Sequence, residues 1–329
     1  MKMVRIGFIG VGGMAQHHMK TLQNMEGVQL TAIFDINEER AKEVSAQFGS
    51  KTYASAEALL DSGEVDGVYI CTPPFAREGI EEAAAKRGIH LLSEKPIGLD
   101  MEVVRRKEQI IKESGIIHTS GYCLRYLDIV QQAKEYLKDK AIHLVMSYRF
   151  GGIPPVKWWL MMEQSGGQLV EQSTHQLDLI RYLAGGVKEV SAIHEQRHLR
   201  EVDPDATAYD VGTVSFVLES GAIGNITSTC LASYVGKGEI EFFGHQFYLS
   251  LNGSTLRIVD DEQDITIKSK VDFYYEQNKT FVEAIRTGNQ GLLLGDFSDA
   301  ADTLEVTLAA NEAAETRKTV SLQLSRAGI

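Results

Sequence analysis

The chain has 329 residues, which is the length of about two ordinary domains. Its composition, 43% hydrophobic and 24% charged, is typical of a globular protein and allows sizeable cores. The formal net charge of -12 and the lack of a long Lys/Arg run disfavour nucleic acid and anionic membranes as partners.

The first third of the chain alternates short apolar runs with amphipathic segments. Segments that predict helices cover residues 15–25, 37–48, 75–87 and 101–114, the last capped by Asp100. Apolar runs that predict strands cover residues 4–10, 30–34, 65–71, 90–93 and 116–120. Strands that are apolar on both faces and alternate with helices are typical of a parallel sheet covered on both sides. We therefore predict an α/β domain over residues 1–123.

The pattern changes after residue 126. A helix (129–138), a strand (142–150), a long loop (151–167) and a helix ended by Gly185-Gly186 (168–184) are predicted in turn. Strands then cover 190–194, 210–218, 224–230, 239–243, 248–251 and 256–259, and helices cover 275–286 and 297–316. Consecutive strands joined by short turns favour an antiparallel or mixed sheet. We therefore predict an α+β domain over residues 124–329.

The apolar segments and the cysteines exclude several classes. No apolar run approaches the roughly 20 residues that a membrane-spanning helix needs. Residues 4–11 are too short and too rich in glycine for a signal peptide, so they are interpreted as a buried first strand. Cys71, Cys123 and Cys230 are widely spaced and odd in number, which argues against disulfides and metal sites. We expect a soluble protein of the cytoplasm with no bound metal.

A glycine-rich turn follows the first predicted strand and opens the first helix. The segment Gly10-Val11-Gly12-Gly13-Met14-Ala15 fits the pattern G-x-G-x-x-G/A. Gly10 permits a tight turn, Gly12 lets a pyrophosphate approach the backbone, and Ala15 allows close packing of helix and strand. The helix N-terminus adds free N–H groups and a positive dipole end. The turn therefore predicts a dinucleotide site, and with it a Rossmann domain.

Asp35 ends the second predicted strand, about 20 residues beyond the turn. An acid at this place accepts hydrogen bonds from the ribose hydroxyls of the adenosine and repels the additional phosphate of NADP. Arg40 is the only nearby cation, and we interpret it as a solvated helix residue. The sequence therefore favours NAD over NADP.

A lysine follows the fourth predicted strand, within Ser93-Glu94-Lys95-Pro96-Ile97-Gly98. Ligands of parallel sheets bind at the carboxyl ends of the strands, which makes Lys95 a candidate cation of the site. Pro96 fixes the backbone after it. Taken alone, the pattern also fits a surface lysine beside a turn.

Polar residues recur along one face of the helix predicted over 168–184. Glu171, His175, Asp178 and Tyr182 follow one another at i, i+4, i+7 and i+11. An acid one turn before a histidine can hold it in one tautomer, which suits proton transfer near neutral pH. A solvated helix face is the alternative, although Gly166-Gly167 and the loop before them favour a pocket wall.

These motifs together resemble the glucose-fructose oxidoreductase/inositol dehydrogenase/MocA (Gfo/Idh/MocA) family over nearly the full length. They are the turn at 10–15, Thr72-Pro73-Pro74, Glu94-Lys95-Pro96, and Gly166-Gly167 leading to Glu171, His175 and Asp178. The resemblance implies an NAD(H)-dependent oxidoreductase that moves a hydride between nicotinamide and a secondary alcohol or ketone of a sugar, inositol or related polyol. It also implies a Lys-Pro peptide that is commonly cis, and a large open C-terminal sheet used to form a homodimer or homotetramer.

The same resemblance assigns roles by position. Lys95 and His175 are the expected catalytic pair, with Glu171 and Asp178 around them. Besides the glycine turn and Asp35, the expected cofactor contacts are Thr72, Pro73, Pro74, Glu94 and Lys95 itself. Further candidates for substrate contact, each of which also fits a packing role, are Tyr122, Arg125, Trp158, Tyr126, Trp159 and Tyr234.

Two positions depart from the family pattern. Glu171 stands where the family usually has Asp, so its carboxylate lies farther from the backbone. Arg77 stands five residues after Thr72, where the family often has His; the resemblance implies that this position touches cofactor or domain-interface groups, and the change to Arg leaves its role open. Two other functions fit relatives of this kind: redox cleavage of glycosides with transient use of NAD, and regulation by a non-catalytic dinucleotide-binding protein. The second can lose the lysine or histidine, whereas this chain retains both.

Overall fold

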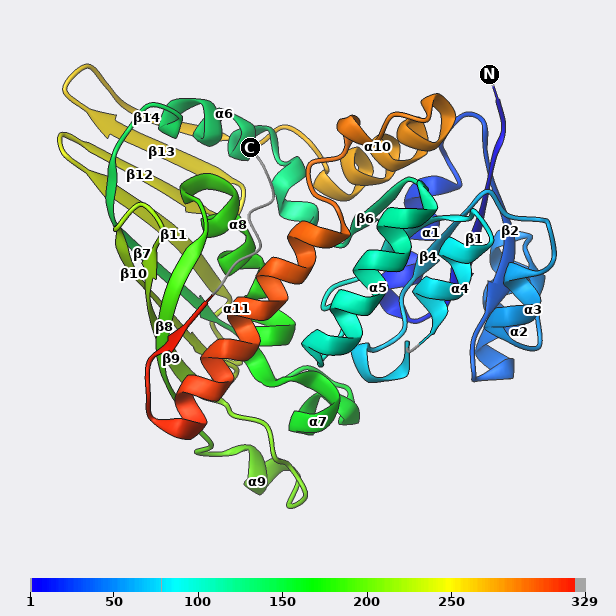
Figure 1. Ribbon diagram of the computed structural model, residues 1–329, viewed down its shortest axis with the longest axis horizontal. Coiled ribbons are helices and arrows are strands. Elements are labelled where there is room, and N and C mark those ends of the chain that lie inside the picture. The colour runs from blue at the N-terminus through cyan, green and yellow to red at the C-terminus, as the bar shows by residue number, and fades with distance from the viewer. Residues whose placement is uncertain (1, 78, 323–329) are drawn as a thin grey trace. The chain divides into compact units, whose positions relative to one another are not determined.

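The computed structural model describes residues 2–77 and 79–322 (Figure 1). The chain forms two compact units. The first takes its described residues from Met1–Tyr126 and Asp272–Ala301, and the second from Leu127–Val271 and Asp302–Ile329. The sequence predicts one boundary, between residues 123 and 124. In the structure the chain leaves the first unit after Tyr126 and returns to it over Asp272–Ala301.

Within the described residues, the first unit is built on a six-stranded parallel sheet with the order β3-β2-β1-β4-β5-β6. This is the strand order of a doubly wound dinucleotide-binding domain, in which successive strands are added on one side of β1 as far as β3 and on the other side from β4 onward. The predicted α/β Rossmann fold is confirmed. The strands are β1 (Val4–Ile9), β2 (Val28–Phe34), β3 (Lys51–Thr52), β4 (Gly67–Ile70), β5 (His90–Ser93) and β6 (His118–Ser120).

Helices cover this sheet, and their ends follow local signals. The predicted cap Asp100 accepts a hydrogen bond from the Val103 amide at the start of α5, and Asn37 accepts one from the Arg40 amide at the start of α2. The single helix expected over 75–87 is instead a short turn, η1, and then α4, because Gly79 has a φ of +80° that an α-helix does not accept. The helical segments are α1 (Gly13–Leu22), α2 (Glu38–Phe48), α3 (Ala56–Leu60), η1 (Pro74–Ala76), α4 (Ile80–Lys86), α5 (Met101–Ser114) and η2 (Cys123–Tyr126).

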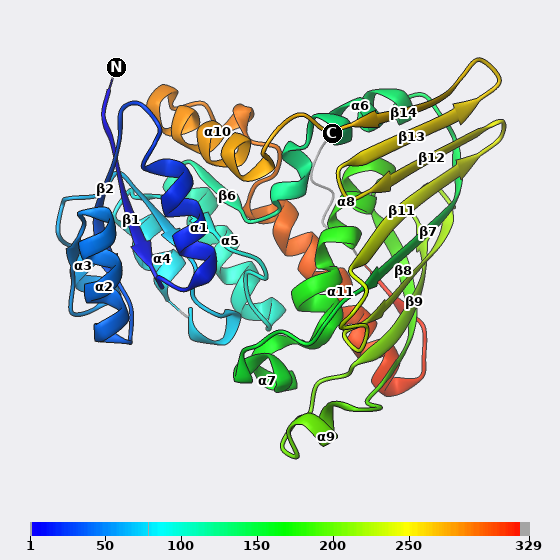
Figure 2. The ribbon, with the colours of Figure 1, turned by 180° about the vertical axis from the view of Figure 1, so that it is seen from behind.

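Helix α10 (Phe273–Thr287) packs in the first unit although it follows the strands of the second in the sequence. Its Phe281 and Ile285 lie in one apolar cluster with Ile6 and Phe8 of β1. Both views show α10 beside α1 (Figures 1 and 2). The short turn η5 (Gln290–Leu292) follows it. An amphipathic pattern predicts such a helix but does not identify the surface that its apolar face covers.

Within the described residues, the second unit is built on a nine-stranded sheet with the order β14-β13-β12-β11-β7-β10-β9-β8-β15. Neighbouring strands are antiparallel except β7 and β10, which pair in parallel. The predicted mainly antiparallel sheet is confirmed. The strands are β7 (Ile142–Phe150), β8 (Val187–Glu195), β9 (Val211–Leu218), β10 (Ile223–Thr229), β11 (Lys237–Gly244), β12 (Phe247–Asn252), β13 (Thr255–Asp260), β14 (Asp264–Lys268) and β15 (Val320–Ser321).

In the part of the chain that the structure describes, helices cover one face of this sheet and none covers the other (Figures 1 and 2). Helix α8 (Thr174–Ala184) packs on β7 and β11, and α6 (Asp128–Leu137) packs on β13. Along β9, residues Val214, Phe216 and Leu218 are buried and alternate with more accessible ones, as a half-covered strand requires. Two further helices are α9 (Leu199–Val202) and α11 (Phe297–Thr316), and the boundary between the units falls within α11.

The segment before α8 differs from the expectation in two ways. The loop expected over 151–167 contains the short helices η3 (Lys157–Leu160) and α7 (Met162–Ser165), because Trp159 is fully buried against Leu199, Ala208 and Cys230. The single helix expected over 168–184 begins with a π-helical segment, η4 (Leu169–Ser173). A π-turn has more residues per turn than an α-helix, so the angular offset between Glu171 and His175 is not that of an α-helix.

Candidate active site and cofactor site

The glycine turn has the backbone geometry that its sequence predicts. Gly10 has a φ of +82°, and a Cβ there would lie 3.0 Å from the carbonyl carbon of Cys71 and the amide nitrogen of Thr72. Apart from the glycines themselves, their chain neighbours and the backbone of their own helix, no described atom lies within 4 Å of where a Cβ on Gly12 or Gly13 would be. In the same description, no side chain caps α1, whose first N–H groups therefore face this open space. A pyrophosphate fits such a cradle.

Asp35 at the end of β2 is a buried carboxylate held in place by four hydrogen bonds. The amides of Val11 and Asn37 donate to it at 2.9 and 2.8 Å. Arg40 donates from Nε at 3.1 Å and from a terminal nitrogen at 2.7 Å. Burial raises the pKa of Asp35, but the bonds from Arg40, Val11 and Asn37 outweigh it and leave the pKa below its usual value.

Arg40 therefore differs from its interpretation as a solvated helix residue. Its guanidinium pairs with Asp35, although 43% of the side chain remains exposed. If Asp35 is the acid that accepts the ribose hydroxyls, as the sequence predicts, an arginine paired with it is close to where the NADP phosphate would lie. The sequence does not predict the pair, because a five-residue spacing across a strand–helix turn has no fixed geometry.

Lys95 lies two residues after the end of β5, at the carboxyl edge of the sheet, and the Lys95–Pro96 peptide is cis. Glu94 turns inward: its Oε1 lies 3.0 Å from Nε2 of His18, and its Oε2 accepts the Lys95 N–H at 3.2 Å. His18 in turn contacts Oδ1 of Asn278 at 2.8 Å. A Cβ on Gly121 would lie 2.4 Å from the Glu94 carboxylate, so a side chain there would displace that carboxylate from its present position. The sequence assigns Glu94 to the cofactor, whereas the structure gives it these partners inside the first unit.

The Thr72-Pro73-Pro74 segment joins β4 to η1 at the same sheet edge. Oγ1 of Thr72 is buried and has no hydrogen-bond partner among the described residues. Its carbonyl accepts a hydrogen bond from Arg77, which is fully buried. An orphaned hydroxyl beside Gly10 is consistent with a ligand at this edge.

In the second unit, the polar stripe before and along α8 is anchored from several sides. The indole nitrogen of Trp159 donates to Oε2 of Glu171 at 3.0 Å. Asp178 is buried and accepts a hydrogen bond from Thr303 at 3.4 Å. His175 is half-buried. The stripe is thus not a uniformly solvated helix face.

Arg149 on β7 is a cation of this region that the sequence does not single out. It lies on the helix-covered side of the strand, in alternation with the buried Val145 and Ser147, and it is half-buried. Burial lowers the pKa of Arg149, and the negative charge of Glu171 opposes that shift. Among the described residues, its guanidinium makes no hydrogen bond or ion pair.

The other candidates for substrate contact have diverse environments. Arg125 is buried, forms an ion pair with Asp299 and donates to the carbonyl of Leu294 at 2.8 Å, all within the first unit. Of the others, Tyr122, Tyr126 and Trp159 are buried, Trp158 is half-buried and Tyr234 is fully exposed. In the described part of the chain, no helix is long and apolar enough to cross a membrane, and no cluster of His, Cys, Asp or Glu suits a metal ion.

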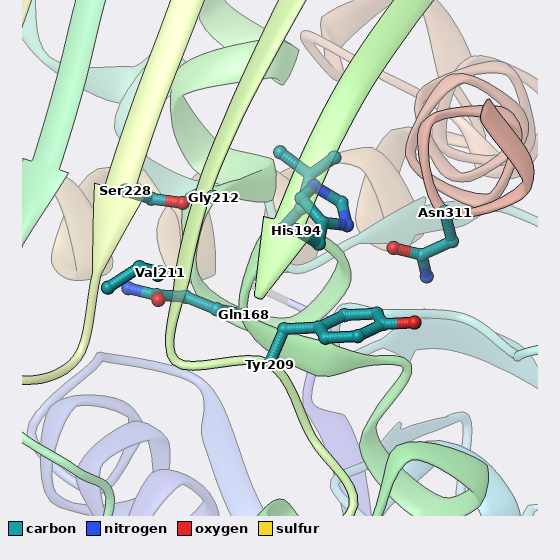
Figure 3. A pocket seen from close by; sticks show the side chains of 8 residues that line it. Gln168, His194, Tyr209, Val211, Gly212, Ser228 and Asn311 are labelled. Carbon is teal, nitrogen blue, oxygen red and sulfur yellow. The ribbon is translucent and has the colours of Figure 1, made fainter. Parts of the chain in front are cut away.

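A small cavity lies between the sheet of the second unit and α11, next to the start of η4 (Figure 3). Gln168, His194, Tyr209 and Asn311 line it. Both amide atoms of Gln168 and Nδ1 of His194 are buried and lack hydrogen-bond partners among the described residues. Burial lowers the pKa of His194 to about 4, so the ring is neutral near pH 7.

This burial predicts an acid-sensitive contribution to stability. In the unfolded chain His194 titrates near its ordinary pKa of 6.5, so between about pH 6.5 and 4 the unfolded state binds more protons than the folded state. The free energy of unfolding should fall by up to about 3 kcal/mol as the pH drops through this window. Urea unfolding at several pH values, with His194→Gln as the control, measures this contribution. An equal pH slope in both proteins would contradict it, because other titrating groups are common to both.

The first unit, with its glycine turn and buried Asp35, defines a dinucleotide-binding protein with an attached α+β unit. Residues 4–122 match the family described as "Oxidoreductase family, NAD-binding Rossmann fold". Residues 130–249 match the GFO/IDH/MocA C-terminal domain. The chain therefore belongs to the Gfo/Idh/MocA family of NAD-binding oxidoreductases, and the resemblance drawn from its motifs is confirmed.

Several relatives are similar over the whole chain. Myo-inositol 2-dehydrogenase of Thermotoga maritima is 27% identical over 337 residues, covering 97% of this chain and 99% of the relative. The scyllo-inositol 2-dehydrogenase (NAD(+)) of Bacillus subtilis is 26% identical over 347 residues, covering 98% of each. The solved structure of levoglucosan dehydrogenase in complex with NADH has a TM-score of 0.88 at 19% identity, covering 98% of this chain and 100% of that one. At that identity the last comparison supports the fold alone.

Proposed function

We propose that this protein is an NAD(H)-dependent dehydrogenase or reductase acting on a secondary alcohol or ketone of a sugar, inositol or related polyol. The observation that carries the proposal lies in the first unit. The uncapped start of α1, the buried Asp35 carboxylate and Lys95 all follow carboxyl ends of strands in one parallel sheet. Pyrophosphate, ribose and a reacting hydroxyl each need one of these groups. The names of the inositol dehydrogenases support the substrate class.

The proposed reaction divides the work between the cofactor and two side chains. NAD supplies the hydride acceptor when it is bound. As the C–H bond of the carbinol breaks, His175 takes the hydroxyl proton and the alcohol becomes a ketone. Lys95, as a cation, donates a hydrogen bond to the same oxygen and stabilises its developing negative charge. The family pattern, rather than the position of the two units, assigns both residues to this hydroxyl.

The charges of the second unit favour an unphosphorylated substrate. Residues 150–165 contain a single cation, Lys157, which lies 3.7 Å from Asp203 and is mostly exposed. Arg149 beside Glu171 is then a donor for a substrate hydroxyl, with Glu171 as a neighbouring acceptor. A donor and an acceptor whose charges act on each other suit the hydroxyl groups of a polyol.

A panel of polyols, free sugars and sugar phosphates, each with NAD and NADP and read by NADH absorbance, tests the proposal. We expect steady formation of NADH from at least one unphosphorylated polyol. Such turnover would also argue against redox cleavage of glycosides, which regenerates its cofactor. Binding of NAD without turnover on a broad panel would contradict the proposal and favour a regulatory protein.

We also assign the uncovered face of the second unit's sheet to contact between copies of this chain, as a homodimer or homotetramer. Met146, Ile193 and Ile223 are exposed large apolar residues on this face. A groove of about 540 Å³ runs over β8, β9 and β10 beside Ile193. Apolar patches of this kind mark association surfaces. Ile193→Glu should shift the mass in solution to that of the monomer, as light scattering would measure.

A further inference from the structure

A buried network of charged side chains lies beneath the loop that carries Lys95. Arg77, Glu81 and Lys107 have exposed fractions of 1%, 0% and 1%, and they come from the loop after η1, from α4 and from α5. Burying charges costs several kcal/mol for each ion unless partners compensate, so a set of three indicates a specific arrangement. Arg, Glu and Lys are rarely buried unless they are paired.

Hydrogen bonds and an ion pair connect these side chains in a continuous network from α5 to the edge of the sheet. Nζ of Lys107 donates to Oε2 of Glu81 at 3.0 Å and to the carbonyl of Arg77 at 3.3 Å. Oε1 of Glu81 accepts the hydroxyl of Ser93 at 2.9 Å and lies 3.8 Å from the Arg77 guanidinium. The opposite charges of Lys107 and Glu81 thereby neutralise each other. Glu81 also accepts the Ser93 hydroxyl, and Lys107 also donates to the backbone carbonyl of Arg77.

The guanidinium of Arg77 completes this hydrogen-bond network by donating to the backbone of two loops. One terminal nitrogen donates to the carbonyl of Glu94 and lies 3.3 Å from the Ser93 hydroxyl, and the other donates to the carbonyl of Thr72. The Glu94 carbonyl belongs to the peptide that ends at the nitrogen of Lys95. The planar fork thus ties together the loops that leave β4 and β5, and a lysine ammonium, as a single point, cannot bridge the two carbonyls in the same geometry.

We infer that Arg77 is a positioning residue for Lys95: its fork, held by Glu81 and Lys107, fixes the Glu94–Lys95 peptide against the Thr72 loop. The inference rests on the proposed function for the role of Lys95, but not for the contacts. The Arg77 side chain is 1% exposed, and its terminal nitrogens donate to the two carbonyls. Its effect on the reaction passes through the backbone of Lys95.

The variant Arg77→Lys keeps the charge and removes the fork. We expect kcat to fall roughly 10- to 100-fold, the loss that follows from moving a reacting group by about 1 Å, while the KM and Kd of NAD stay within about twofold. Amide hydrogen exchange in the peptide that contains residues 93–98 should accelerate at least about tenfold. Ile111→Ala, a core truncation one turn from Lys107 on α5, is the control for lost stability alone.

The two readouts separate the possible failures. If Arg77→Lys retains wild-type exchange in residues 93–98, or if Ile111→Ala accelerates that exchange equally, the positioning role is wrong whatever the activity. If exchange accelerates but kcat is unchanged, Lys95 does not depend on this contact and the inference is likewise overturned. If the wild-type protein turns over no substrate, the proposed function fails, and the exchange data still decide whether Arg77 holds the loop.

Discussion

Lys95→Met should lower kcat by roughly 10²- to 10⁴-fold, the range found for loss of a proton-transfer partner or of a donor to a developing oxyanion. Methionine retains most of the length and apolar stem of lysine but removes its charge and its hydrogen-bond donors. Lys95 lies at the carboxyl end of β5, where ligands of this fold bind. The glycine turn and Asp35 are on other strands and remain unchanged, so the Kd of NAD should stay near its wild-type value.

Steady-state kinetics on the best substrate of the panel, with titration of NADH by fluorescence, measure the two quantities separately. Lys112→Met is the matched control. Lys112 is exposed on α5, so this substitution makes the same chemical change outside the site. A Lys95→Met protein with more than about a tenth of wild-type turnover would remove Lys95 from the reaction. A parallel loss of NADH binding would instead make it a cofactor contact.

The parts of the fold that the sequence predicts well are those that local chemistry determines. Gly10 must adopt a φ of +82°, which few residues other than glycine accept, so the turn could be located without the structure. Asp100 and Asn37 cap their helices as their side chains allow. The bounds of β7 and α11 agree with the predicted ones, because an alternating or amphipathic run ends at clear breaks.

Other features depend on tertiary packing that no local pattern records. The apolar face of α10 could cover either unit, and only its packing against Ile6 and Phe8 decides. The π-helical start at Leu169–Ser173 depends on how its side chains pack, because its residues fit an α-helix equally well by propensity.

The pairing of the buried charged residues in the first unit likewise could not be predicted from the sequence. Arg77 and Lys107 would each be placed on the surface by residue type, since Arg and Lys are rarely buried without partners. Their partner Glu81 is four residues from one and 26 from the other, so only the fold brings the three together. The missed pair of Asp35 and Arg40 is closer in sequence, and it bears directly on the choice of cofactor.

Asp35→Ser should shift the cofactor preference toward NADP. The ratio of kcat/KM with NAD to kcat/KM with NADP should fall by roughly 10²- to 10³-fold, because a like charge beside the 2′-phosphate costs several kcal/mol. The pKa of Asp35 lies below its usual value, so this negative charge is present throughout the neutral range. The loss of the carboxylate also removes the partner of Arg40, whose exposed guanidinium then becomes available to a phosphate.

The double variant Asp35→Ser/Arg40→Met separates these two contributions. If Arg40 binds the phosphate, the gain with NADP should shrink by about tenfold relative to Asp35→Ser, while kcat/KM with NAD changes little between the two variants. If Arg40 only neutralises Asp35, the two variants should use NADP equally well. An unchanged ratio in Asp35→Ser would show that the carboxylate serves to hold the Val11 and Asn37 amides and does not discriminate between the cofactors.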